Sequence, residues 1–405
     1  MIIGIDASRA NRQFKTGVEW YSYFLIESLA RLDKDNKYRL YTDKALSPDI
    51  KEFLANRNNF SVRFLSWPFG AFWNLIRLSW EMIWHRPKAL FIPAGAMPII
   101  HPKKTFVTIH DIAFKREDQV YDKEAFINHA GRRKGFLNFI LKNYFWLSSG
   151  RFQFSPTDYL DWSTAYALKK AYKIITVSEF SKQEIIDVYK TPANKIKVIY
   201  NGYNPNFKVI DDKEKISELL DSYGIDFPYI LYVGRLEKKK NIPLLLEAFA
   251  LLKERHPEIK EKLVLVGAAG FGYDEIKYII EEYDLNNDVI LLGWTEEAHM
   301  PYIYNGAKAF VFPSRHEGFG IPVMQSLVCG LATLCSDIPA LREVAGDSVL
   351  YFNKDDKRDL ADNLYNIISD NELRENLRRS GLERAKFFSW DKAALEMLQL
   401  WYEKK

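Results

Sequence analysis

The sequence predicts an α/β protein made of two Rossmann-like, doubly wound domains. Its 405 residues are too many for one ordinary hydrophobic core, which favours two domains. Short apolar strands alternate with amphipathic helices, a pattern typical of parallel sheets with helices on both faces. The alternation begins anew near residue 229. We therefore expect two domains facing each other across a cleft, with a ligand at the carboxyl ends of their strands.

Each series of elements is predicted in chain order. The first comprises strands at 2–5, 38–42, 89–92, 106–109, 174–177 and 197–199, with helices at 17–32 and 181–189. The second comprises strands at 229–233, 263–266, 289–292, 309–312, 331–335 and 349–351, with a helix at 242–255. A polar stretch near 203–228 interrupts the core pattern. We therefore assign residues 1–208 to the first domain and 209–385 to the second.

Composition narrows the class of protein. An aromatic content of 15% excludes a disordered chain. The two cysteines, Cys329 and Cys335, lie in an apolar stretch without a framing His or second Cys pair, so we expect buried thiols and no metal site. We expect a cytoplasmic protein for three reasons. The cysteines are few, the first segment lacks the features of a signal peptide, and no apolar run approaches the ~18 residues of a membrane span.

Charge is distributed unevenly along the chain. Residues 1–200 hold 31 Lys and Arg against 19 Asp and Glu, whereas the remainder holds 26 against 34. A basic first half favours an anionic partner, either lipid head groups, a phosphorylated acceptor or nucleic acid. Nucleic acid is disfavoured, because no nucleic-acid motif is present and the excess charge is spread over many segments.

Two aromatic segments are ambiguous. Residues 121–165 lack a clear strand, and an apolar, aromatic body at 136–147 follows three basic residues, Arg132, Arg133 and Lys134. This arrangement resembles an interfacial membrane helix, although a packed insertion helix in the first domain explains it as well. The same two interpretations apply to residues 69–84, which contain Phe72, Trp73, Trp80 and Trp84.

The strongest chemical signal is the string FVFPSRHEGFGIP at residues 310–322. A buried strand ends in a turn, and Gly318 and Gly320 precede a helix. Glycines let the backbone approach a ligand closely, and a helix N-terminus offers free N–H groups to a phosphate. Glu317 at this turn can accept hydrogen bonds from sugar hydroxyls. The glycines alone would indicate only a strand–loop–helix with a surface Glu, but the full string favours a functional site.

A second string, VGRLEKKKN at residues 233–241, follows the first strand of the second domain. Arg235 offers a planar fork and Lys240 a point charge, a combination that suits a diphosphate. A basic loop alone is usually only solvated. Its position after this strand favours a role in binding.

These strings resemble the retaining family 4 glycosyltransferases of the GT-B fold, bacterial mannosyltransferases among them. The resemblance is strongest over 228–352 and is supported by IHD at 109–111, VSEFS at 177–181, YNG at 200–202 and FSW at 388–390. It implies that the last helix crosses back, so that residues 386–405 pack on the first domain.

The resemblance also implies roles for individual residues. Gly17 matches the glycine that starts the first helix near the donor phosphates, and His110 matches the histidine near the anomeric centre of the transferred sugar. Arg235 and Lys240 match the diphosphate-binding pair. Glu317 matches the first acid of a motif with two Glu residues separated by seven positions. Backbone contacts to the donor are expected from Gly318, Phe319, Gly320 and Ile321.

The sequence departs from the family at the second acid, where Gln325 stands. Gln can still accept and donate hydrogen bonds, but without charge its bonds to ribose hydroxyls are weaker. We therefore expect weaker donor binding and not an inactive protein. Trp294, which follows the strand at 289–292, is placed either near the donor base or in the core.

The resemblance implies retention of anomeric configuration without a metal or other cofactor. Arg235, Lys240 and the helix N-terminus can stabilise the charge that develops on the leaving nucleoside diphosphate. Asp33-Lys34-Asp35 has the spacing of a metal-binding pair, but it follows a helix, so we expect a solvated turn. No further carboxylate is placed as a nucleophile, which favours a same-face mechanism.

The expected function is therefore transfer of a hexose from a nucleoside-diphosphate sugar to a glycan or lipid-linked glycan in surface polysaccharide synthesis. GDP-mannose is the first candidate donor and UDP-sugars remain open. A peripheral position on an anionic cytosolic membrane face is also expected. The alternatives are a non-catalytic nucleotide-sugar-binding protein, favoured by Gln325, and an epimerase of the same architecture.

Overall fold

The chain folds into two compact units in a computed structural model that describes residues 1–68, 72–116 and 156–403. The first unit comprises Met1–Val177, Ser181–Ile199 and Trp390–Lys405, and the second comprises Ser178–Phe180 and Tyr200–Ser389. The boundary expected at residue 208 therefore lies inside the second unit. The return to the first unit occurs at Trp390, slightly later than the expected residue 386.

The first unit is built on a parallel sheet whose seven described strands lie in the order β3-β2-β1-β4-β5-β6-β7. The chain order reverses between β1 and β4, which is the switch point at which such sheets bind ligands. β4 is buried along its whole length, as expected for a strand covered by helices on both faces. The strands are β1 (Ile2–Asp6), β2 (Lys37–Thr42), β3 (Phe60–Phe64), β4 (Ala89–Ile92), β5 (Lys104–Thr108), β6 (Lys173–Thr176) and β7 (Ile196–Val198).

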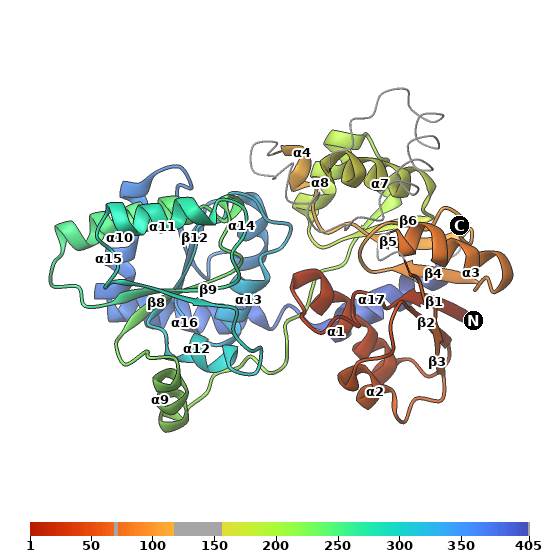
Figure 1. The fold of residues 1–405 in the computed structure, drawn as a ribbon, viewed down its shortest axis with the longest axis horizontal. Coiled ribbons are helices and arrows are strands. Elements are labelled where there is room, and N and C mark those ends of the chain that lie inside the picture. The colour runs from red at the N-terminus through yellow and green to blue at the C-terminus, as the bar shows by residue number, and fades with distance from the viewer. Residues whose placement is uncertain (69–71, 117–155, 404–405) are drawn as a thin grey trace. The chain divides into compact units, whose positions relative to one another are not determined.

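Helices connect and cover these strands (Figure 1). They are α1 (Gly17–Leu32), α2 (Pro48–Leu54), η1 (Trp73–Arg77), α3 (Leu78–Trp84), α4 (Ala113–Arg116), α7 (Pro156–Lys170), α8 (Glu179–Tyr189), η2 (Ala193–Lys195) and α17 (Trp390–Tyr402). In α1, Tyr21, Leu25 and Leu29 are buried at a spacing of four residues, so one helical face packs inward.

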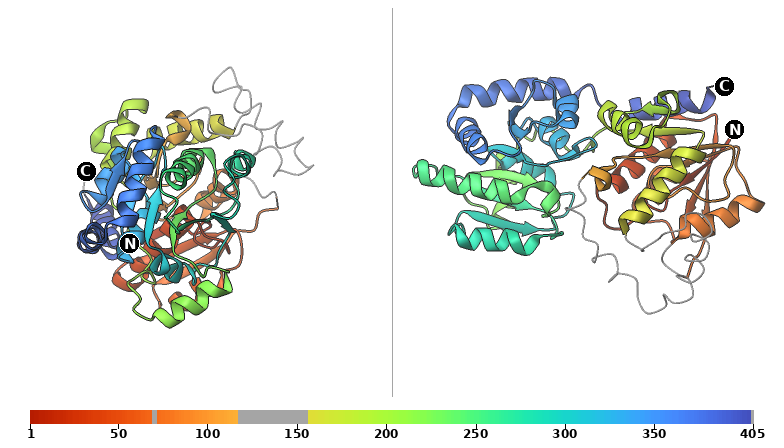
Figure 2. Two further views of the ribbon diagram at one scale, coloured as in Figure 1. Left: turned by 90° about the vertical axis from the view of Figure 1, so that its left-hand side faces the viewer. Right: turned by 90° about the horizontal axis from the view of Figure 1, so that it is seen from above.

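The last helix, α17, packs on α1 of the first unit. Figures 1 and 2 show this helix, drawn in blue, among the red and orange N-terminal elements. Met397, Leu400 and Trp401 of this helix are buried, and the Trp401 ring lies against Tyr38 of β2 and Phe91 of β4. Both chain ends also meet at Asn36, whose Oδ1 accepts from the Met1 amino group at 2.8 Å and from the Tyr402 hydroxyl at 2.9 Å.

The second unit contains a parallel sheet with the described strand order β10-β9-β8-β11-β12-β13. Its switch point lies between β8 and β11. The strands are β8 (Tyr229–Val233), β9 (Lys262–Val266), β10 (Val289–Gly293), β11 (Ala309–Phe312), β12 (Thr333–Ser336) and β13 (Leu350–Phe352).

Helices pack against this sheet and against one another, with α10 on α15 and α13 on α16. The helices are α9 (Lys213–Ser222), η3 (Lys238–Lys240), α10 (Ile242–Arg255), α11 (Tyr273–Glu282), α12 (Met300–Gly306), α13 (Ile321–Val328), α14 (Pro339–Ala345), α15 (Lys357–Ser369) and α16 (Asn371–Ala385). Among the described residues, no helix combines the length and the apolar character needed to cross a membrane.

The two cysteines are buried and free, which confirms the sequence-based expectation of core thiols. Burial raises the pKa of the Cys329 thiol to about 12 and the pKa of the Cys335 thiol further still. Neither thiol ionises at neutral pH, so neither is reactive in this fold.

Candidate functional site

The two loops that carry the strongest sequence signals lie at the carboxyl edge of the second sheet. β8 and β11 are adjacent, hydrogen-bonded parallel strands on either side of the switch point. The loop after β8 carries Lys240, and the loop after β11 carries Glu317. Because the carboxyl ends of neighbouring parallel strands meet at one edge, the fold brings the two loops together where this class of sheet binds ligands.

Lys240 and Glu317 form an ion pair in which the lysine Nζ donates to the carboxylate Oε1. The two side chains are only 16% and 12% exposed, and Nζ lies 5.5 Å from the centre of the Phe312 ring. Burial acts to raise the pKa of Glu317, but the charges of Lys240 and Lys239 outweigh it and hold that pKa below its ordinary value. A lysine and a carboxylate therefore stand together as an ion pair at this edge of the sheet.

Asn241 holds the lysine loop in place. It is buried, adopts the left-handed conformation with φ of +57°, and begins α10. Its amide Nδ2 donates to the carbonyl of Lys354 at 2.9 Å, and its Oδ1 accepts from Arg315 Nε at 3.1 Å. The Arg315 backbone N–H also donates to the carbonyl of Lys239 at 3.2 Å. The loops after β8, β11 and β13 are thereby fixed to one another beside Lys240.

Gly320 sets the start of α13. Its φ is +92°, and a Cβ at this position would lie 2.5 Å from the Leu341 side chain, so only glycine fits. Ile321 begins the helix, and first-turn N–H groups have no partner within a helix. Gly318 and Phe319 are buried just before it. The arrangement provides the helix N-terminus that the sequence predicted for phosphate contact.

A second close backbone approach involves Gly267, which the sequence analysis did not single out. A Cβ on Gly267 would lie 2.0 Å from the carbonyl oxygen of Gly234, so the loop after β9 packs directly on the loop after β8. The available signal was a glycine immediately after the buried strand β9, in the same position that Gly234 has after β8.

Arg235 and Trp294 are more exposed than the ion pair. The Arg235 side chain is 62% exposed, with Nε 3.7 Å from an oxygen of Glu237. It lies on the same loop as Lys240 and does not join the pair with Glu317 in this conformation. Trp294 follows β10, which is separated from β8 by β9, and is 57% exposed. The alternative that Trp294 is a core residue is therefore wrong.

Gln325 lies on α13, half-buried, where the family motif has an acid. Its Oε1 accepts from the hydroxyl of Tyr304 at 3.3 Å, and Tyr304 is fully buried beneath it. The same hydroxyl lies 3.4 Å from the Pro322 carbonyl oxygen, so the Gln325 oxygen shares its single proton with a second acceptor.

In the first unit, His110 follows β5 and is half-buried. Its Nε2 lies 3.0 Å from the carbonyl of Pro93, and its ring makes an edge contact with Tyr21 at 4.6 Å between centres. Burial lowers the pKa of His110 below its ordinary value, so the ring is neutral at pH 7. Because a carbonyl can only accept, Nε2 carries the proton, and Nδ1 presents a lone pair.

Gly17 is the first residue of α1, as the sequence predicted. The carboxylate of Glu19 folds back and accepts the Thr16 backbone N–H at 3.2 Å, while its other oxygen accepts from Arg9 at 3.2 Å. One donor at the start of this helix is therefore satisfied by the protein itself.

Asp6 is a buried acid at the carboxyl end of β1, beside the switch point of the first sheet, that the sequence analysis missed. Its carboxylate accepts from the backbone N–H of Ser8 at 2.9 Å and from the side chain of Asn74. Burial raises the pKa of Asp6 to about 6. An acid ending a buried first strand was the available signal.

The aromatic segments are only partly described. Arg132, Arg133 and Lys134 lie outside the described residues, and α7 begins beyond them. In the other segment, Trp73 is buried and donates its Nε1 to the carbonyl of Leu65 at 2.8 Å. Trp80 and Trp84, in contrast, are 63% and 71% exposed.

The Asp33-Lys34-Asp35 turn follows α1, as expected, but Asp33 is not solvated. It is 5% exposed, and its carboxylate accepts from the Asn36 side chain at 2.7 Å and from the Tyr38 hydroxyl. Burial opposes ionisation, but these bonds bring the pKa of Asp33 below its ordinary value. Within the described part of the chain, no group of three or more His, Cys, Asp or Glu side chains could hold a metal ion.

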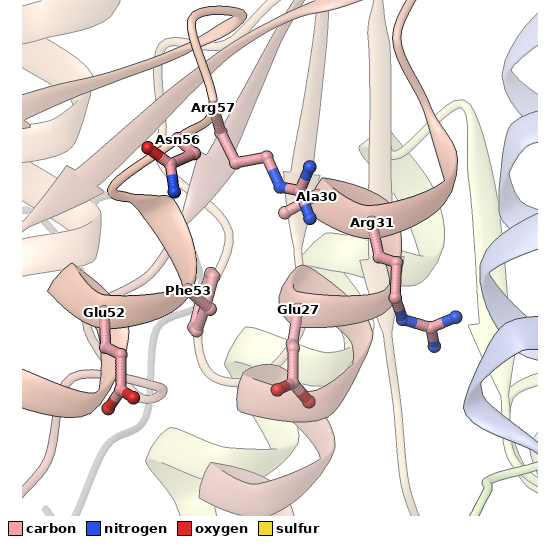
Figure 3. A pocket seen from close by; sticks show the side chains of 7 residues that line it. All are labelled: Glu27, Ala30, Arg31, Glu52, Phe53, Asn56 and Arg57. Carbon is pink, nitrogen blue, oxygen red and sulfur yellow. The ribbon is translucent and has the colours of Figure 1, made fainter.

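A hollow of about 350 Å³ lies elsewhere, between α1 and α2 (Figure 3). Figure 3 shows the side chains of Glu27 and Glu52 at one end of it, with Phe53 between them. The hollow is lined by two carboxylates and by the guanidinium groups of Arg31 and Arg57, and none of the predicted donor-binding residues lines it. It is therefore not the donor site.

Comparisons with known proteins agree with this arrangement. The family model of glycosyl transferases group 1 matches residues 213–384, and that of glycosyltransferase family 4 matches residues 16–207. O-antigen chain mannosyltransferase B of Escherichia coli is 30% identical over 250 residues, which are 61% of this chain and 65% of that relative. The match thus spans just under two thirds of the relative's length.

Two further similarities are informative. A Campylobacter jejuni enzyme, N-acetylgalactosamine-N,N'-diacetylbacillosaminyl-diphospho-undecaprenol 4-alpha-N-acetylgalactosaminyltransferase, is 31% identical over 57% of this chain and 60% of its own. The crystal structure of Anabaena HepE with UDP and glucose matches 98% of both chains with a TM-score of 0.68 and 17% identity, a likeness of fold. The two family models between them cover most of the sequence, and the two sheets have the switch points described above. This chain therefore belongs to the family 4, or group 1, glycosyltransferases of the GT-B fold.

Proposed function

We propose that the chain is a retaining hexosyltransferase that moves a hexose from a nucleoside-diphosphate sugar to a glycan or lipid-linked glycan. The observation that carries the proposal is the buried Lys240–Glu317 pair at the switch point of the second sheet. The lysine supplies charge for a diphosphate, and the carboxylate supplies acceptors for sugar hydroxyls. The family membership and the name of the E. coli relative support transfer of a sugar, with mannose the first candidate.

The proposed chemistry needs charge stabilisation at the leaving group. As the bond between the anomeric carbon and the phosphate oxygen breaks, negative charge gathers on the nucleoside diphosphate. Lys240 and the start of α13 are positioned donors of the kind that stabilise such charge, and Arg235 on the same loop can join them when the donor binds, which makes a metal unnecessary in this proposal. The new bond forms on the same face, and the acceptor hydroxyl passes its proton to the departing phosphate.

His110 is proposed to orient the transferred sugar. The neutral ring has its Nε2 proton directed to Pro93, so Nδ1 can accept a hydrogen bond from a sugar hydroxyl. His110→Gln is therefore expected to lower kcat with little effect on nucleotide affinity.

The acceptor is proposed to be a lipid-linked glycan at an anionic membrane face. The basic first half of the sequence favours an anionic surface, and the Campylobacter relative carries a diphospho-undecaprenol acceptor in its name. GDP-mannose is the first donor to test and UDP-sugars are the second.

Transfer is tested directly with purified protein, radiolabelled GDP-mannose or UDP-sugars, and polyprenyl-diphosphate-linked glycans, with and without EDTA. We expect labelled lipid with one of these donors, unchanged by EDTA, and an α-linked product by NMR, which is retention from an α-linked donor. Glu317→Gln and His110→Gln are the loss-of-function variants. A β-linked product or complete inhibition by EDTA would contradict the proposed mechanism while leaving transfer itself established.

A non-catalytic nucleotide-sugar-binding protein is the second candidate, because Gln325 replaces an acid and its acceptor oxygen is used by Tyr304. Gln325→Glu distinguishes the two functions. If the protein is a transferase, the glutamate should increase its affinity for the donor, and turnover should be retained. A binder gains affinity and still gives no labelled lipid with any donor.

A further inference from the structure

The inner face of helix α3 is apolar and packs against the first unit. Leu78 and Met82 are buried at a spacing of four residues and pack into the core of the first unit. Ser79 on the same side accepts the backbone N–H of Ile99 at 2.8 Å. This inner face fully accounts for the attachment of α3 to the fold.

The outer face of α3 is also apolar, although it is exposed. Trp80, Ile83 and Trp84 follow one another at the same helical spacing and are 63%, 49% and 71% exposed. A helix at the surface of a soluble domain normally presents polar residues outward, and clustered exposed aromatic side chains mark an interaction surface. Ile100, 37% exposed, lies on the loop that hydrogen-bonds to Ser79 and extends the apolar area. Figure 1 shows α3 at the periphery of the first unit.

Basic residues predominate in the sequence around this outer face. From Arg57 to His110 the sequence contains seven Lys and Arg residues and one acid, Glu81. Glu81 is 4% exposed and is paired with Arg63 at 2.8 Å and Arg77 at 3.7 Å. Arg86 and Lys88, directly after the helix, are exposed. The outward surface is therefore aromatic and aliphatic along the helix and has a basic margin at its carboxyl end.

We propose that the outer face of α3, formed by Trp80, Ile83 and Trp84, inserts into the interface of a bilayer that contains anionic phospholipid. Tryptophan is favoured at the boundary between acyl chains and head groups, and the basic margin attracts anionic head groups. The inference rests on the membrane location proposed above and names the surface that provides it. It places the anchor on α3 and makes no use of Arg132, Arg133 and Lys134.

A second copy of this chain is a poorer occupant of the same surface. A two-fold symmetric contact would place the same patch on both subunits, so the cations of one copy would face the cations of the other. Glu81, the acid of this region, is already paired and cannot offset that repulsion. An anionic surface meets no such penalty.

Vesicle binding tests the proposal. Full-length protein is mixed with vesicles of phosphatidylglycerol and phosphatidylcholine, or of phosphatidylcholine alone, and sedimented. The variants are Trp80→Ser/Ile83→Ser/Trp84→Ser and Arg86→Glu/Lys88→Glu. The control is Tyr278→Ser/Leu395→Ser, which removes side chains that are 62% and 49% exposed on α11 and α17. Nucleotide calorimetry and thermal melting of each variant report on the donor site and the fold.

We expect binding to anionic vesicles that weakens about tenfold or more in the α3 triple variant, as expected for loss of interfacial apolar area, and stays unchanged in the control. The charge variant should bind more weakly and with less dependence on salt. Quenching of tryptophan fluorescence by brominated lipid should occur in the wild type and fall in the α3 variant. Nucleotide affinity should be equal in all four proteins.

Three outcomes would overturn the proposal. The first is unchanged vesicle binding of the α3 variant, with binding lost instead when Arg132, Arg133 and Lys134 are substituted. The second is a wild-type protein that binds nucleotide and does not bind anionic vesicles, in which case the transferase proposal stands and the anchor fails. The third is a wild-type dimer in sedimentation that the α3 substitutions convert to monomer.

Discussion

The Lys240–Glu317 pair is the residue-scale basis of the proposed donor site. Both side chains are nearly buried, and removing one partner of such a pair leaves the other charge uncompensated. The pair thus links donor binding to the stability of the second unit. It also means that Lys240 must exchange part of its bond with Glu317 for bonds to a phosphate when the donor arrives.

Lys240→Met should destabilise the second unit by about 3 kcal/mol at pH 7, the magnitude typical of a broken buried ion pair. The pKa of Glu317 is lowered in the folded protein, so its contribution is present above the unfolded pKa and is lost as the pH falls through the folded value. The difference between wild type and variant should therefore be largest near neutral pH and shrink in acid. Urea unfolding at pH 7 and pH 4 measures it, and a difference that does not change with pH would contradict the account.

Asp6 gives a pH dependence of the opposite sign. Its pKa is raised from 3.8 to about 6, so the stability that it contributes is full below the unfolded value and is lost as the pH rises through about 6. Asp6→Asn, which mimics the protonated acid, should gain up to about 3 kcal/mol relative to wild type between pH 4 and pH 7. Thermal unfolding of both proteins across this range is the test. Parallel pH profiles would show that Asp6 is not perturbed.

At the element scale, most segments that position the site could be predicted from periodicity. The bounds of α1, α10, β8 and β11 coincide with the predicted residues because each is a clean apolar pattern with a clear stop. β3 was missed because it is an edge strand with exposed Val62 and Phe64 and no buried run. The sequence could not decide whether residues 69–84 pack in the core or face a membrane. A helix that is apolar on both its inner and its outer face has no clear polar side, so periodicity does not show which face is buried.

The role of Asn241 could not be read from the sequence because it depends on three loops that meet only in the fold. Asn241→Gly keeps the left-handed backbone and loses both amide bonds, whereas Asn241→Ala loses the bonds and adds backbone strain. We expect both variants to bind donor about tenfold more weakly. Each lost hydrogen bond is worth about 1 kcal/mol, and water that replaces the amide recovers part of this. Alanine should also lower the melting temperature more than glycine. Equal donor affinity in wild type and Asn241→Gly would remove Asn241 as a positioning residue.

The start of α13 makes a related prediction. Gly320→Ala forces a Cβ against Leu341 in a left-handed conformation, so the helix N-terminus must shift. Weaker nucleotide binding is expected, with partial recovery in Gly320→Ala/Leu341→Ala, which removes the steric conflict and leaves the strain. Calorimetry of the two variants measures this. If the double variant shows no recovery, the loss of nucleotide affinity comes entirely from backbone strain at residue 320 and not from the contact with Leu341.

At the scale of the whole molecule, the chain crosses between its two units more than once. Residues 390–405 belong to the first unit although they end the chain, and α17 buries Met397, Leu400 and Trp401 against it. The family resemblance predicted this return, which local sequence patterns alone could not, because an amphipathic helix does not specify its partner. The basic first half likewise indicated an anionic partner, and the structure adds an outward helical face of α3 that suits a bilayer.

Removing residues 390–405 should therefore damage the first unit and spare the second. Burial of three large apolar side chains is worth several kcal/mol, at about 1.5–3 kcal/mol each. Limited proteolysis should cleave the first unit of the truncated protein at low protease concentration, while nucleotide binding by the second unit persists. A truncated protein as resistant as the full chain would contradict the assignment of α17.

Calorimetric titration of GDP-mannose, and then of UDP-sugars, into wild type, Lys240→Met and Lys238→Met tests the central claim most directly. Lys238 lies two residues away, is 43% exposed and pairs with Glu275 at 2.8 Å, so it is a matched control for loss of one lysine from the same loop. The account predicts metal-independent binding of one donor by wild type and Lys238→Met alike, and binding about 10- to 100-fold weaker by folded Lys240→Met, as for loss of one charged hydrogen bond. Equal affinity in all three proteins, or no binding of any nucleotide by wild type, would contradict it.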